Sequence, residues 1–440
     1  MRVFFSAGEA SGDAYAAQIL QRLQPEPLQP ILAELAAFKH DEGIDSPARL
    51  EAALRASHRG LSRAAEEHMI QFYAEFQRQF GVDVPPGLGH RETIEFIHAH
   101  LLQASDRALL HAQGVGGGRL EDAGAEIVAD SSRWGAVGII ESIKVSPRVI
   151  AGYYAAKRAM RTGRPGLFVP IDFGFMNIKL ARYAKRKGWK VLYFIPPGSW
   201  RKTKQGADLP AVTDAIVTPF PWSAKILNEM GANAHYFGHP LKEMVGTVPD
   251  AEVRTGIAVL PGSRGHEIEQ NVPVIAQAIE LLPGPVRIAV APNADEREIE
   301  HAWLKWSDHT PILSRETYSV LKSSRAAVVC SGTATLEAAL CGCPCVVVYR
   351  GNKVMEFEYR LRRPKFDYIS LPNILLDRPL LKELIQWDAT VPAIRDEATA
   401  LLAEGPRREE VLVGFREIYD SLGPTDCLER TAALARSMLD

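Results

Sequence analysis

Apolar runs and amphipathic segments alternate along most of the chain. Runs such as Arg2–Ser6, Gly166–Ile171 and Val191–Ile195 have the length and apolar content of buried strands. Each is followed by a loop and then by a segment whose apolar positions recur with helical spacing. This order is typical of parallel sheets covered by helices and predicts an α/β fold. Residues from about 24 to 113 show helical periodicity alone, which predicts a helical insertion.

The clearest strand–helix–strand unit lies in the second half of the chain. Apolar strands are expected over Ala326–Cys330 and Pro344–Tyr349, with a helix at about Ala334–Leu340 between them. Together these segments predict one βαβ unit. The turn between the first strand and the helix must therefore lie at the amino end of that helix.

This turn consists of Ser331, Gly332 and Thr333. Its backbone N–H groups and the positive end of the helix dipole favour a bound phosphate. Glu337, one turn into the helix, is placed to accept hydrogen bonds from a ribose. The alternative is structural, with the glycine shaping a tight turn and Glu337 stabilising the helix start.

A second glycine-bearing loop follows the first strand. It contains Gly8, Glu9, Ser11, Gly12 and Asp13, and its glycine spacing does not match the dinucleotide-binding fingerprint. A nicotinamide cofactor is therefore not indicated. The polar residues of this loop are candidates for ligand contact, and helix capping by Ser11 or Asp13 is the alternative.

Two further residues suggest specific chemistry. Arg264 follows Ser263 in a loop between a predicted strand and helix, where it could bind a pyrophosphate through two hydrogen bonds. A surface salt bridge is the competing assignment for this arginine. Asp172 follows a predicted strand, at the edge where a parallel sheet faces its ligand, and is a candidate general base. Capping of the following turn by Asp172 is the alternative.

The strand–helix units fall into two sets, separated near Val245–Glu252. We expect an N-terminal Rossmann-like domain over residues 1–245, with the insertion, and a second over 246–415, followed by a helical segment over 416–440. Two glycine-rich loops then lie on facing halves, so a phosphorylated ligand is expected in the cleft between the domains.

Composition excludes several classes of protein. A formal charge of −2 over 440 residues argues against electrostatic capture of nucleic acid. No uninterrupted apolar run approaches membrane-spanning length, which predicts a cytoplasmic protein. Neither the cysteines at positions 341, 343 and 345 nor the histidines of the insertion have the spacing of metal ligands, so no metal site is expected. The helix expected to reach Arg161 is apolar and basic, a pattern that fits packing on a sheet or contact with an anionic membrane.

Several motifs occur in an order that resembles lipid A disaccharide synthase. They are GEASGD, WGAVGIIES, a strand ending in ID shortly before an asparagine, GHPL, LPGSRGHEIE, SGTATLEAAL and DYISLPNIL. The resemblance covers the chain except for the insertion. It implies an inverting, metal-independent glycosyltransferase of the GT-B type, with two Rossmann-like domains and carboxyl-terminal helices that return to the first. The implied reaction transfers acylated glucosamine from a UDP donor to the 6-hydroxyl of acylated glucosamine 1-phosphate, forming a β-1,6 linkage.

The resemblance also implies roles for individual residues. Ser263 and Arg264 match the donor pyrophosphate site, while Asn373 matches an asparagine that lines the same cleft. The residues that match the rest of the nucleotide site are Ser331, Gly332, Thr333 and Glu337. Asp172 is similar to the family's proposed catalytic base. Trp200 and Arg201 are the part of a longer family segment that this chain clearly retains.

Three departures concern the acceptor half. Gly174 and Phe175 stand where the family has proline and a second aspartate, the Trp200 segment is shortened, and the insertion is foreign to the family. These changes suggest a UDP-sugar transferase whose acceptor differs. The rival hypotheses are an epimerase or cell-wall transferase of the same fold and a non-catalytic UDP-sugar-binding relative.

Family membership would also imply a location and partners. Lipid-linked substrates imply peripheral contact with the cytoplasmic face of the inner membrane, which raises the expectation for residues 134–154. A homodimer is one of the assemblies that the family forms. No cofactor beyond the UDP-sugar substrate is expected.

Overall fold

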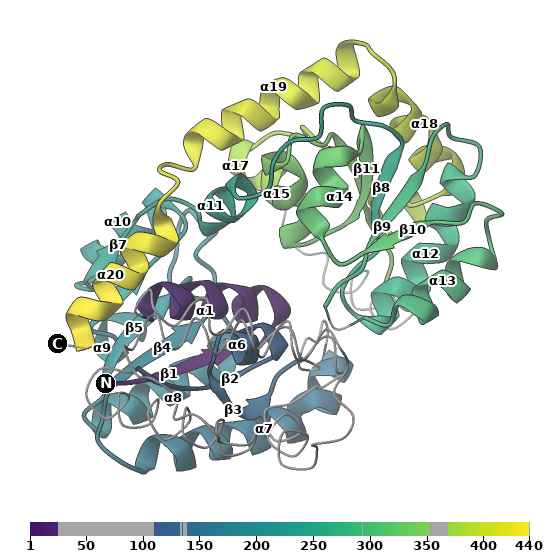
Figure 1. The fold of residues 1–440 in the computed structure, drawn as a ribbon. Coiled ribbons are helices and arrows are strands. Elements are labelled where there is room, and N and C mark those ends of the chain that lie inside the picture. Colours follow the sequence, from purple (N-terminus) through teal and green to yellow (C-terminus); the bar gives the residue numbers. More distant parts are fainter. Residues whose placement is uncertain (25–109, 133, 135–138, 293, 352–367, 440) are drawn as a thin grey trace, which may run out of the picture.

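The computed structural model describes residues 1–24, 110–132, 134, 139–292, 294–351 and 368–439, and the helical insertion predicted between 24 and 113 lies almost wholly outside them. Figure 1 shows two α/β domains that face each other, and a cleft lies between them. Each has a parallel sheet covered by helices on both faces. The predicted α/β architecture with two Rossmann-like domains is therefore confirmed.

The N-terminal sheet has the strand order β3-β2-β1-β4-β5-β6-β7. Its strands are β1 (Arg2–Ala7), β2 (His111–Gly116), β3 (Glu126–Asp130), β4 (Leu167–Ile171), β5 (Lys190–Phe194), β6 (Ala215–Val217) and β7 (Ala234–His235). Its helices are α1 (Ala10–Leu23), α6 (Gly118–Asp122), α7 (Ile139–Arg161), α8 (Gly174–Arg186), α9 (Leu209–Val212), α10 (Pro221–Glu229) and α11 (Pro240–Gly246). Every residue of β4 is buried because helices cover both faces of the sheet, which explains its continuous apolar run.

The C-terminal sheet has the order β10-β9-β8-β11-β12-β13. Its strands are β8 (Ile257–Leu260), β9 (Val286–Ala289), β10 (Ile312–Ser314), β11 (Ala326–Cys330), β12 (Cys345–Tyr349) and β13 (Glu383–Ile385). Its helices are α12 (Gly265–Ile279), α13 (Glu296–Leu304), α14 (Thr317–Ser323), α15 (Thr333–Leu340), α17 (Leu371–Leu376), α18 (Val391–Leu402) and α19 (Pro406–Ser421). The order of both sheets reverses beside the first strand of each domain, where α/β folds bind ligands.

The carboxyl-terminal helices join the two domains. Helix α19 leaves the C-terminal domain, and α20 (Cys427–Leu439) packs against α1 and α11 of the N-terminal domain (Figure 1). The boundary predicted after residue 415 falls inside α19, which continues to Ser421. Lys242 of α11 holds the end of α19 and the segment that follows it. Its Nζ donates to the carbonyls of Tyr419 at 2.9 Å and Gly423 at 2.7 Å.

The glycine-rich stretch from Gly114 to Gly118 has the composition of a turn, yet its first three residues belong to a strand. The glycines from 114 to 116 belong to β2, which also moves the end of the insertion back before His111. A Cβ on Gly114 would lie 3.0 Å from the Leu120 side chain and from the Phe5 carbonyl. Glycine is used here because neighbouring groups approach closely, whereas the sequence suggested a need for a turn.

None of the described helices combines the length and apolar character that a membrane span requires.

Candidate active site

The cleft lies where the carboxyl ends of both sheets meet. It has a volume of about 800 Å³ and is lined from the N-terminal domain by residues that include Glu9, Ser11 and Arg119. The opposite wall comes from the loop before α12, the turn before α15 and the side chain of Tyr318. The volume suits a ligand as large as a nucleotide sugar.

A carboxylate organises the loop before α12. Glu267, in the first turn of the helix, is 2% exposed, and its Oε2 accepts from the backbone N–H of Ser263 at 3.0 Å and of Arg264 at 3.3 Å. These bonds satisfy donors that a helix start otherwise leaves free. The N–H groups of Ser263 and Arg264 are therefore already bonded, and a phosphate on this loop would depend on the Arg264 side chain and the remaining helix end.

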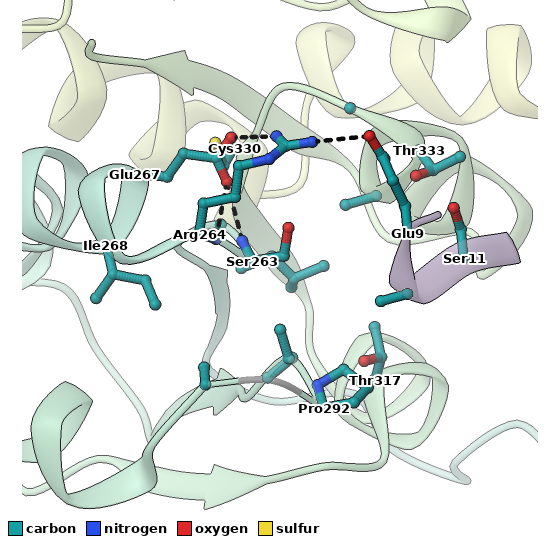
Figure 2. A pocket seen from close by; sticks show the side chains of 18 of the residues that line it. Glu9, Ser11, Ser263, Arg264, Glu267, Ile268, Pro292, Thr317, Cys330 and Thr333 are labelled. Atoms are coloured by element: carbon teal, nitrogen blue, oxygen red, sulfur yellow. Dashed lines mark hydrogen bonds and ion pairs between the residues drawn. The ribbon is translucent and has the colours of Figure 1, made fainter. Parts of the chain in front are cut away.

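Arg264 points across the cleft between two carboxylates, as Figure 2 shows. Its Nη1 lies 2.7 Å from Glu267 Oε1, and its Nη2 lies 3.5 Å from Glu9 Oε1 of the other domain. The buried Nε has no hydrogen-bond partner among the described residues. This geometry is compatible with both roles predicted for Arg264, binding a pyrophosphate and forming a salt bridge. Its ion pairs lie inside the cleft and not on the outer surface.

The turn before α15 has an open conformation. Gly332 has a φ of 150°, which favours glycine, and a Cβ at this position would meet no atom within 4 Å. Gly332 and Thr333 are exposed to the cleft, whereas the Ser331 hydroxyl donates to the Ile369 carbonyl at 3.1 Å. The first turn of α15 has no acidic residue and no side-chain cap, so its N–H groups can receive an anion.

Glu337 extends from α15 toward the N-terminal domain. Burial raises the pKa of its carboxyl to about 7, while the positive charge of Arg119 and a hydrogen bond from Tyr318 act in the opposite direction. The Tyr318 hydroxyl donates to Glu337 Oε1 at 3.5 Å. Arg119 belongs to α6, so this cluster, like the Arg264 cluster, combines charges from both domains.

Asp172 ends β4 in a strained conformation. Both Asp172 and Phe173 have positive φ angles, 43° and 42°. Such angles cost non-glycine residues about 1–3 kcal/mol each and persist where the surroundings enforce them. Two hydrogen bonds hold the Asp172 carbonyl, one from Asn177 Nδ2 at 3.0 Å and one from the Tyr193 hydroxyl at 2.7 Å.

The Asp172 carboxyl is tuned toward proton transfer. The Asp172 side chain is exposed to solvent. Surrounding protein atoms nevertheless remove part of the hydration of its carboxyl, which raises its pKa to about 6, and the negative charge of Glu9 acts in the same direction. A carboxyl with this pKa is ionised at neutral pH and is a stronger base than an ordinary aspartate. Asp172 does not line the cleft itself, but Glu9, which does, is close enough to influence it.

The loop after β1 has divided roles. Ser11 and Glu9 line the cleft, while Gly8 supports the Asp172 turn, since a Cβ there would lie 2.2 Å from the Phe173 ring. Gly12 is buried next to Ile171. Asp13 is buried, and its carboxylate accepts from the N–H of Gly117 at 2.6 Å and of Arg119 at 3.1 Å. Asp13 therefore holds the start of α6, a helix distant in sequence, and its predicted contact with a ligand is not supported by its position.

Three other predicted residues do not line this cleft. Asn373 is 1% exposed and is fully used within the protein, where it bonds both the N–H and the carbonyl of Leu381 and also Glu383. Asn373 therefore lies outside the described lining of this cleft, and its role in nucleotide binding stays a prediction. Trp200 and Arg201 lie on the loop after β5, outside the cleft lining, with the guanidinium 5.3 Å from the indole centroid.

Some functional candidates were missed from the sequence. Glu267, Arg119 and Tyr318 line the cleft although none was singled out, and Tyr193 was taken only as part of a strand. Glu267 carried a usable signal, because a Glu three residues after a helix N-cap is typical of a capping box. Within the described ranges, no group of three His, Cys, Asp or Glu side chains is arranged to hold a metal ion.

Two facing parallel-sheet domains and a terminal helix that returns to the N-terminal domain define the GT-B fold, and the cleft between the domains carries an arginine and an open helix end. The model of the family described as lipid-A-disaccharide synthetase matches residues 93–436. The chain belongs to this family and is a glycosyltransferase.

Curated relatives agree with this assignment. The lipid-A-disaccharide synthase of Koribacter versatilis is 31% identical over 350 residues, which cover 75% of this chain and 90% of the relative. That of Myxococcus xanthus is 32% identical over 344 residues, covering 74% and 89%. Among solved structures, MurG of Acinetobacter baumannii aligns with a TM-score of 0.45 and 14% identity, covering 77% of this chain and 94% of that one.

Proposed function

We propose that the protein transfers an acylated glucosamine from a UDP donor to the 6-hydroxyl of an acylated glucosamine 1-phosphate, with inversion to a β-1,6 linkage. Family membership supports the reaction. Arg264 and Asp172 belong to opposite domains, and Glu9 lies near both. This observation supports separate sites for the donor and the acceptor. The donor then binds mainly to the C-terminal domain and the acceptor to the N-terminal one.

Arg264 and the open end of α15 hold the donor diphosphate in this proposal. The guanidinium can exchange its 3.5 Å contact with Glu9 for a phosphate oxygen, since that ion pair is long and partly exposed. Glu267 keeps the other side of the guanidinium fixed, which preorganises it. Glu337 accepts hydrogen bonds from the ribose hydroxyls.

Asp172 acts as the base. It removes the proton of the acceptor 6-hydroxyl as that oxygen attacks the anomeric carbon of the donor sugar. The bond between this carbon and the diphosphate oxygen breaks, and UDP leaves with the electron pair. Arg264 and the helix dipole stabilise the charge that develops on the leaving group, so the chain's own groups can support the step.

We further propose that α7 contacts the membrane that carries the lipid substrates. Ile150 is 52% exposed and Tyr154 is 63% exposed, one helical turn apart. Exposed Arg148 and Arg158 flank them, and Lys157 lies 5.7 Å from the centroid of the Tyr154 ring. An apolar pair within a basic border suits the surface of an anionic bilayer. The predicted contact around residues 135–144 involves side chains that are not described.

The direct test is the reaction itself. Purified protein is mixed with acylated UDP-glucosamine and acylated glucosamine 1-phosphate, and the products are identified by mass spectrometry and NMR. The proposal predicts UDP and a β-1,6-linked disaccharide in equal amounts. UDP release without disaccharide would indicate another acceptor, and UDP binding without turnover would favour a non-catalytic relative.

A further inference from the structure

A group of cations lies on the loop after β5, outside the cleft described above. Arg201, Lys202 and Lys204 are exposed, and no acidic side chain of the described residues pairs with them. The loop has a defined shape, because the Arg201 N–H donates to the Gly198 carbonyl at 2.9 Å and the Gln205 amide donates to the Arg201 carbonyl at 2.9 Å. Unpaired cations on a shaped loop favour an anionic ligand.

An aromatic platform stands beside these cations. Phe220 and Trp222, at the start of α10, stack with ring centroids 4.6 Å apart and an interplanar angle of 8°. Lys202 Nζ lies 5.8 Å from the centroid of the Trp222 ring, which connects the two loops. A stacked aromatic pair next to a cation can hold the apolar face of a sugar close to an anionic group.

Buried polar groups without a described partner occur on the same two loops. The buried atoms Gln205 Oε1, Thr218 Oγ1, Trp222 Nε1 and Ser223 Oγ have no hydrogen-bond partner among the described residues. Thr218 and Ser223 are 0% exposed. Native structures leave few such groups, and each calls for an explanation. Three of these four atoms can donate a hydrogen bond to an anion.

These two loops adjoin the proposed base. β5 is the neighbour of β4 in the sheet, and β6 follows β5, so their loops emerge about 5 and 10 Å from the end of β4. The loop after β5 touches the segment that carries Asp172, since a Cβ on Gly174 would lie 2.6 Å from the Pro197 ring. A ligand bound by these loops can therefore present a second group to Asp172.

We propose that the loop from Arg201 to Gln205 and the Thr218–Ser223 segment form a phosphomonoester subsite. Arg201 and Lys202 bind the 1-phosphate of the acceptor, and the Trp222 platform supports its sugar. The 1-phosphate and the reacting 6-hydroxyl are separate groups of one sugar, so a single acceptor can contact the cations and Asp172 at the same time. This inference rests on the proposed function, of which it specifies the acceptor site.

The test compares two acceptors in two proteins. Initial rates are measured in detergent with acylated glucosamine 1-phosphate and with the same lipid lacking the phosphate, using wild type and Arg201→Gln/Lys202→Gln. Wild type should lose at least tenfold in kcat/KM when the phosphate is absent. The double variant should lose a similar factor with the phosphorylated acceptor, and its discrimination between the two acceptors should fall below threefold. Its affinity for UDP should match that of wild type.

A matched control removes the same charge elsewhere. Lys187→Gln/Lys190→Gln alters exposed cations at the other end of β5 and should keep full discrimination. Full discrimination in Arg201→Gln/Lys202→Gln would overturn the proposal. So would a variant that keeps discrimination and loses only binding to anionic vesicles, because the cations would then serve a lipid headgroup. If wild type forms no disaccharide with either acceptor, the proposed function fails first.

Discussion

Asp172 shows how a residue gains a role from its surroundings. Its backbone conformation is unfavourable, and Asn177 and Tyr193 maintain it through bonds to a single carbonyl. Asn177 also bonds Ser6 and Ile171, which connects the turn to β1 and β4. The position of the carboxyl therefore depends on contacts between three strands.

Removing one of these bonds should impair catalysis more than stability. Tyr193→Phe deletes a donor to the Asp172 carbonyl and should cost about 1 kcal/mol in the free energy of unfolding. We expect kcat to fall roughly tenfold, because small displacements of a catalytic group are costly, with the KM for donor unchanged. Tyr183→Phe is the control, because it removes a 3.4 Å bond from α8 to the Lys157 carbonyl, away from the Asp172 turn. Equal losses in both variants would argue against a positioning role.

The raised pKa of Asp172 predicts a pH dependence. A base must be ionised, so kcat/KM should fall as pH drops through about 6 and level off at higher pH. Glu9 contributes to the raised pKa, so Glu9→Gln should move this inflection to lower pH. Rate profiles of both proteins between pH 4.5 and 8.5 give the comparison. An inflection at the same pH in Glu9→Gln would contradict the proximity of the two carboxyls.

Helix α12 combines stability and function at its first turn. Glu267 caps the helix and fixes Arg264 with one carboxylate. Glu267→Ala should lower the free energy of unfolding by about 1–2 kcal/mol, the usual cost of losing a cap. It should also weaken UDP binding, because Arg264 loses its support. Calorimetric titration measures the affinity of Glu267→Ala for UDP. Tighter binding than in wild type would contradict the prediction and would mean that Glu267 competes with phosphate.

Helix α7 offers a separate test of the membrane proposal. Ile150→Asp/Tyr154→Asp places two charges on the exposed apolar pair and should reduce co-sedimentation with anionic vesicles at least fivefold. Both positions are exposed, so stability should change little. Disaccharide formation in detergent serves as the control and should be retained. Unchanged co-sedimentation would contradict the proposed contact between α7 and the membrane.

At the scale of the whole molecule, the sequence predicted what local patterns determine. The strand from Ala326 to Cys330 has the predicted bounds because it is buried on both faces and bordered by small polar residues. The two domains followed from repeated strand–helix units. The motif resemblance identified the family because the motifs retain their order.

Contacts between distant segments were harder to foresee. Asp13 and Asn373 looked like ligand residues, yet they bond backbone groups about 104 and 8 positions away. The glycines of β2 looked like a turn because spacing cannot distinguish a bend from a close approach. Arg119 reaches the cleft only because α6 packs on α1, which no local pattern reveals.

The central claim is that the donor site and the base belong to opposite domains, with Glu9 near both. The most direct measurement compares UDP affinity and kcat in Asp172→Asn and Arg264→Gln. Asp172→Asn should bind UDP within twofold of wild type and lose at least a hundredfold in kcat, the usual contribution of a general base. Arg264→Gln should lose roughly tenfold or more in UDP affinity as well as turnover. The account is contradicted if Asp172→Asn keeps its turnover or if Arg264→Gln binds UDP as wild type does.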